Sequence, residues 1–164
     1  MKRFVLAAAA VLAVLFSSCE KQEVQHTGDL SGNLYGVWAL ETKTETYQSN
    51  SSGGKQTTRE IDYSGVNFYL AMGEFPFPHA IAKKGSFTTF DLDDVDVDAV
   101  IFTYNAEKQQ IEFKKRLWLS DNFLTYNMIL DGTFDVLELS EKRFVIQQTG
   151  VLTGTTTYSF SRYK

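Results

Sequence analysis

Cysteine, histidine and proline are scarce in this chain of 164 residues. Its one cysteine, Cys19, excludes a disulfide within the chain. The two histidines, His26 and His79, are far apart in the sequence, and no HExxH, CxxC, GxSxG or glycine-rich phosphate loop is present. Nucleophilic catalysis needs a base beside the nucleophile and a third group that orients the base. We therefore expect no enzymatic activity, no cofactor and no bound metal.

Long hydrophobic runs are also rare, and the longest lies at the N-terminus. Residues 4–16 are 13 consecutive apolar residues, with Lys2 and Arg3 before them and two serines after them. A membrane-spanning helix needs about 20 apolar residues. A charged start, a short apolar core and small residues at the end are typical of a cleaved secretory signal.

The stretch LFSSCE, which contains Cys19, resembles the signal of bacterial lipoproteins. In that family the chain is cut before the cysteine, which is then acylated. The family prefers leucine where this chain has Phe16. The resemblance implies a signal peptide at 1–18 and firm anchoring by several acyl chains on Cys19. Because Glu20 follows, it also implies the cell outer membrane, on either its periplasmic or its surface-facing side. The alternative is a secreted protein with an incidental thiol.

The mature chain would be acidic. Loss of Lys2 and Arg3 reduces the 16 basic residues to 14, against 20 acidic ones. Such a surface repels nucleic acid, so we expect no nucleic-acid partner. Residues 19–33 are polar and lack a sustained period, which indicates a flexible tether. The folded domain is expected at 34–164.

Nearly all of residues 34–164 alternates between apolar and polar side chains. Trp38 and Leu40 share one side of the first expected strand with three threonines, and Lys43 lies on the other side with Glu45. Asp131-Gly132 and residues 140–142 are turn signals. Further strands are expected at 57–63, 66–72, 86–92, 99–105, 109–120, 123–130, 133–139, 143–150 and 155–163. The pattern predicts an all-β fold, an antiparallel sandwich or up-and-down barrel of about eight or nine strands.

The first strand opens with a Gly-x-Trp motif, Gly36 and Trp38, directly after the expected tether. Together with the lipoprotein signal and the antiparallel meander, this motif resembles the lipocalin-like lipoproteins of Gram-negative bacteria. The resemblance covers residues 34–164. It implies that Trp38 packs across a closed barrel end, that Gly36 lets the chain turn in beside it, and that Arg162 covers the indole ring. The alternative is that Trp38 is a core residue of some other β fold.

One segment, residues 73–85, interrupts the alternation. Two prolines follow Phe75 and Phe77, which bars a central strand there, and HAIAKK, which starts at His79, favours one or two helical turns. Loops on a rigid scaffold often carry function. We therefore expect this segment to lie over an open barrel mouth, where Phe75, Phe77 and His79 contact a ligand or partner. The alternative is a packed crossover in which His79 is a plain loop residue.

Two charged features are candidate sites. Lys115 shares a face with apolar neighbours, so straight alternation points its ammonium inward, toward a carboxylate, water or an anionic ligand. The alternative is a bulge or a rim position. The acidic run at 91–98 fails as a calcium loop, since Ala99 replaces the required glycine and Asn105 the twelfth-position acid. We expect it to be a solvated face rather than a metal site.

Aromatic residues are abundant, at 14% of the chain, and most must belong to the core. A barrel of eight strands is either filled by side chains or holds one small ligand. Two functions are therefore open for a lipid-anchored envelope barrel. It binds a small hydrophobic ligand, or it is a protein-interaction module, such as an envelope adaptor or inhibitor barrel, with a filled interior.

Overall fold

The computed structural model describes residues 28–48, 56–85, 98–121, 125–150 and 154–163. These residues form nine strands and no helix. The strands are β1 (Gly36–Gln48), β2 (Gln56–Asp62), β3 (Phe68–Gly73), β4 (His79–Lys84), β5 (Val100–Asn105), β6 (Gln110–Ser120), β7 (Asn127–Leu139), β8 (Arg143–Gly150) and β9 (Gly154–Arg162). The all-β expectation is therefore confirmed.

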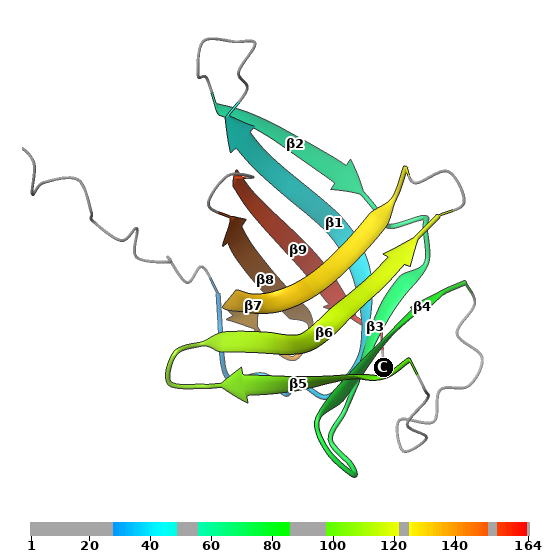
Figure 1. The fold of residues 1–164 in the computed structure, drawn as a ribbon, viewed down its shortest axis with the longest axis vertical. Coiled ribbons are helices and arrows are strands. Elements are labelled where there is room, and N and C mark those ends of the chain that lie inside the picture. The colour runs from blue at the N-terminus through cyan, green and yellow to red at the C-terminus, as the bar shows by residue number, and fades with distance from the viewer. Residues whose placement is uncertain (1–27, 49–55, 86–97, 122–124, 151–153, 164) are drawn as a thin grey trace, which may run out of the picture.

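The strands close into an antiparallel barrel. From β3 to β9 each strand pairs with the next along the chain, and β1 joins β9 to β3 to complete a ring of eight. β2 is an additional strand. It pairs with residues 42–48 of β1, while β3 pairs with residues 36–39. Because β9 occupies the other edge of β1, β2 and β3 lie in line along one edge. In Figure 1, β5, β6 and β7 cross in front of β1, β8 and β9.

Two expected details of the strands are wrong. HAIAKK does not form helical turns, because its whole length pairs with β3, from Gly73↔His79 to Phe68↔Lys84. This ladder overrides the local helix preference of alanine and lysine. Asp131-Gly132 does not form a turn either, since it lies inside the single long strand β7. Gly132 has a φ of 77°, and the pairing with β6 shifts register beside it. The expected strand at 86–92 lies outside the described residues.

The barrel interior is packed with apolar side chains over most of its length. Trp38 packs on Phe144, Phe144 on Phe160, and Phe134 on both Phe113 and Tyr158, with ring centroids 5.4 to 6.2 Å apart. The buried cluster also includes Leu40, Phe68, Leu70, Met72, Phe102, Ile111, Met128, Leu130 and Ile146. This is the packing expected of an eight-stranded barrel whose interior is filled by its own side chains.

The two ends of the barrel differ. The start of β1, the β3–β4, β5–β6 and β7–β8 turns and the end of β9 lie at one end, which we call the closed end. The ends of β1, β4, β6 and β8 lie at the other end, which we call the mouth. In Figure 1 the β3–β4 turn is at the bottom of the view, and the end of β6 is at the upper right.

Residues 28–33, which the sequence assigned to the tether, lie against β7 at the closed end. The amide of Gly28 donates to the carbonyl of Leu137, and the amide of Gly32 donates to the carbonyl of Leu139. A Cβ at Gly32 would overlap the backbone of Ser140. The ordered part of the chain therefore starts no later than residue 28.

Candidate binding site at the barrel mouth

The closed end is sealed by Trp38, whose side chain is fully buried. Its Nε1 donates to the carbonyl of Leu34 at 2.8 Å. The guanidinium of Arg162 lies 4.0 Å from the indole centroid, and it donates to the carbonyls of Tyr35 and Asn33. Gly36, with a φ of 136°, turns the chain into β1 beside this ring. The structure thus brings Gly36, Trp38 and Arg162 together at this end of the barrel.

A β-bulge in β1 changes which of its side chains face the interior. Leu40 pairs with Phe160 of β9 and Thr42 with Ser159, so one extra residue, Glu41, sits in β1 between the two pairs. Directly opposite residues in a sheet point to the same face. Lys43 is paired with the core residue Tyr158 and therefore points into the barrel. Straight alternation had placed Lys43 on the opposite side from Trp38.

Lys43 is the buried charge that the sequence analysis missed. Its side chain is 5% exposed, and its Nζ contacts Glu45 Oε1 at 2.7 Å and Asn127 Oδ1 at 2.8 Å. The ammonium also lies 5.7 Å from the ring centroid of Tyr158. A buried ammonium needs such partners to offset its lost hydration. Together, Lys43, Glu45 and Asn127 form a polar layer above the aromatic core.

Two tyrosines extend this polar layer to the edge of β7. Tyr63 Oη donates to the carbonyl of Asn127 and accepts from its amide. Tyr158 Oη does the same with Ile129. The hydroxyls replace a partner strand, since β8 pairs with β7 only from Asp135 onward. Burial raises the pKa of Tyr158 to about 12. Both phenols therefore serve as fixed neutral hydrogen-bonding groups.

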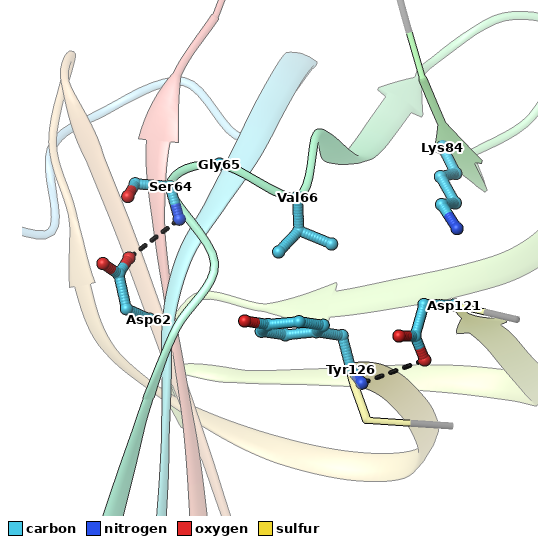
Figure 2. A pocket seen from close by; sticks show the side chains of 7 residues that line it. All are labelled: Asp62, Ser64, Gly65, Val66, Lys84, Asp121 and Tyr126. Atoms are coloured by element: carbon cyan, nitrogen blue, oxygen red, sulfur yellow. Dashed lines mark hydrogen bonds between the residues drawn. The ribbon is translucent and has the colours of Figure 1, made fainter. Parts of the chain in front are cut away.

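A hollow of about 640 Å³ lies between the β2–β3 turn, the end of β4, and Asp121 and Tyr126 beside the ends of β6 and β7. Figure 2 shows the ring of Tyr126 below Val66, with Lys84 at one side. Asp62 and Asp121 also line the hollow, together with Ser64 and Gly65. The volume is within the range of about 300–1,000 Å³ that is usual for small-molecule sites. We call this hollow the mouth pocket.

The lining of the mouth pocket is mixed in character. Asp62 accepts a hydrogen bond from the amide of Ser64, and this bond lowers the pKa of its carboxyl group. Asp121 accepts from the amide of Tyr126 at 3.1 Å. The ring of Tyr126 packs edge-on against Tyr63, which links the pocket to the polar layer. The pocket thus offers an aromatic surface, carboxylate acceptors and one ammonium donor.

The residues expected to cover the mouth lie elsewhere. Phe75 and Phe77 are in the β3–β4 turn, and Gly73 and His79 on either side of it pair at the closed end. The expectation that this segment lies over an open mouth is therefore wrong. The prolines do interrupt the strand, but they do so at a hairpin turn whose arms both continue in the sheet.

His79 is not a loop residue. It opens β4, is 1% exposed, and packs against the ring of Phe77. Its Nδ1 lies 2.8 Å from the carbonyl oxygen of Phe77, and its Nε2 has no hydrogen-bond partner. The hydrogen bond of this imidazole is therefore to the backbone of the adjoining β3–β4 turn.

Lys115 points outward, contrary to the expectation from alternation. Phe113 pairs with Gly132 and Leu117 with Leu130, so β6 contains two extra residues in this interval. Phe113 and Leu117 both stay buried, while Lys115 between them is exposed. The alternative interpretation, a bulge, is the one that the structure shows.

Two further expectations fall wholly or mostly outside the described residues. Cys19 and residues 91–97 are among those not described, and Asp98 is exposed. Within the described part of the chain, no group of three or more His, Cys, Asp or Glu side chains is arranged to hold a metal ion. Nor does any helix there have the length and apolar character to cross a membrane. A comparison of the chain with protein-family models, curated proteins and solved structures found no match.

Proposed function

We propose that the protein is a lipid-anchored envelope barrel that binds a small amphipathic molecule in the mouth pocket. The observation that carries this proposal is the position of the hollow above a filled core. Trp38 and the other buried aromatic side chains fill the interior of the barrel. A wholly apolar ligand deep in the barrel would have to displace them.

The chemistry of the mouth supports a ligand with one apolar and one polar part. Val66 and the Tyr126 ring offer the apolar contact, and Lys84, Asp62 and Asp121 offer polar contacts around it. Ligand sites commonly combine apolar lining with a few converging polar groups that fix orientation. Tyr126 also links the pocket to the polar layer, because its ring packs edge-on against Tyr63.

The proposed lipid anchor and cellular location rest on the sequence alone. The resemblance of the LFSSCE stretch to lipoprotein signals supports acylation of Cys19 and an outer-membrane location. We further propose that the protein is not an enzyme and uses no cofactor, since the sequence contains no recognisable catalytic motif.

A protein-interaction module is the second candidate function, and one surface favours it. Trp118 and Ile129 are paired across β6 and β7 on the outside of the barrel, and they are 59% and 39% exposed. An aromatic residue of this kind is a common anchor in protein interfaces. In that case the partner would be an envelope protein and the mouth pocket would have no ligand.

Native mass spectrometry of the mature lipoprotein, released from its own membranes, tests these functions. We expect a co-purified small molecule on the wild type, lost in Lys84→Glu and retained in Lys114→Glu. Lys114 is a matched control because it is exposed on β6 and pairs with Glu112 away from the pocket. Retention of the molecule in Lys84→Glu would contradict the mouth site. A partner protein lost specifically in Trp118→Ser would favour the interaction module.

A further inference from the structure

Two phenylalanines are exposed at the closed end of the barrel. Phe75 is 70% exposed and Phe77 is 40% exposed, both in the short turn between β3 and β4. Proline follows each of them, so the backbone that carries the rings is restricted. Exposed aromatic rings on a stiff turn lose little conformational entropy when they move from water into an apolar environment.

The N-terminal segment leaves the barrel at the same end. Gly28 is hydrogen-bonded to Leu137 near the end of β7, and from there the chain reaches β1 through Leu34. Nine Cα–Cα steps separate Gly28 from Cys19. At roughly 3.3–3.6 Å a step, the longest possible reach is about 30 Å. An acylated Cys19 therefore keeps Gly28, at the closed end, within about 30 Å of the bilayer.

We infer that the closed end rests on the lipid surface, with Phe75 and Phe77 in its interfacial layer. This inference uses the lipid anchor of the proposed function, but not the mouth pocket. Phenylalanine at the headgroup–acyl boundary is typical of proteins that lie on a membrane. Lys142, exposed in the β7–β8 turn, and Arg143, exposed at the start of β8, add cations at headgroup level at the same end.

This orientation has a consequence for the mouth pocket. The mouth is the opposite end of the barrel, so it points away from the bilayer and toward the aqueous phase. A ligand would then enter the pocket from the aqueous phase and not directly from the bilayer.

Fluorescence quenching in vesicles tests the orientation. The full mature lipoprotein is inserted into phosphatidylcholine vesicles that contain lipid brominated close to the headgroup. Trp118→Phe serves as the background, in which Trp38 is the remaining tryptophan. An indole is then introduced by Phe75→Trp at the closed end or, as a matched control, by Tyr47→Trp at the mouth. Tyr47 is also exposed, at 40%, and lies near the end of β1.

We expect the indole at position 75 to lose most of its fluorescence and the indole at position 47 to lose none, each relative to the background. Equal quenching at both positions, or quenching only at position 47, would overturn the orientation. Co-flotation with the vesicles is measured in parallel. A protein that floats without quenching at position 75 overturns the membrane contact alone. A protein that does not float overturns the anchor, and the contact with it.

Discussion

Replacement of Arg162 by methionine should destabilise the barrel, because one guanidinium holds four separate groups at the closed end, among them the carbonyl of Glu141 at 3.4 Å. It stacks on Trp38 at 4.0 Å and donates to the carbonyls of Tyr35 and Asn33. A partly desolvated cation–π contact contributes about 0.5–2 kcal/mol. Each hydrogen bond from a charged donor contributes about 1.5–3 kcal/mol. Since water can reach the freed carbonyls in part, we expect a net loss of about 2–4 kcal/mol in unfolding free energy.

Urea denaturation in a Trp118→Phe background, followed by the fluorescence of the buried Trp38, measures this loss. Arg162→Lys should be intermediate, since a single ammonium keeps the charge but does not replace the planar fork of donors. Arg143→Met is the matched control. Arg143 is 57% exposed, bonds to Ser159 Oγ and lies 3.6 Å from Glu138, so its loss should be below about 1 kcal/mol. If Arg162→Met were no more destabilising than Arg143→Met, the role of Arg162 at the closed end would be refuted.

Three further predictions concern pH, a close backbone contact and processing. Tyr158 has a folded-state pKa of about 12 against 10.0 when unperturbed, so its contribution to stability is complete below pH 10 and is lost as pH rises toward 12. Urea denaturation between pH 10 and 12 should show a smaller decline in unfolding free energy for Tyr158→Phe than for the wild type. Gly154→Ala should lower the melting temperature strongly, because φ is +82° and a Cβ would overlap the carbonyl of Thr46, whereas Gly65→Ala, with open space around it, should not. Cys19→Ala should move the protein from the membrane to the soluble fraction, and an unmodified Cys19 thiol in native membranes would refute acylation.

Local signals were sufficient to predict the strands that end in clear turns. Residues 99–105 and 109–120 form the β5–β6 hairpin, and residues 140–142 separate β7 from β8 as expected. In these regions the alternation and the turn residues lie within a few positions of one another. Both signals then predict the same hairpin, and the prediction does not depend on contacts with distant parts of the chain.

Whether Asp131-Gly132 forms a turn or lies within a strand depends on a neighbouring strand in the sheet. A turn and a bulge both use a glycine with positive φ, so the local sequence is the same for either. The outcome was decided by β6, which pairs with β7 on both sides of Gly132 and holds it in one continuous strand. The segment at His79–Lys84 is similar, because its pairing with β3 made it a strand.

The interior chemistry of the barrel was the least predictable property, because two bulges decide it. One extra residue at Glu41 turns Lys43 from the outer face to the inner face, and two extra residues in β6 leave Lys115 outside. Counting every second residue therefore selected the wrong lysine as the inward charge. The corrected position of Lys43 also bears on the proposed function. Lys43 and Glu45 form an ion pair in the polar layer. A purely hydrophobic ligand, expected from the number of aromatic residues, would have to desolvate that pair on entering the barrel interior, which costs free energy.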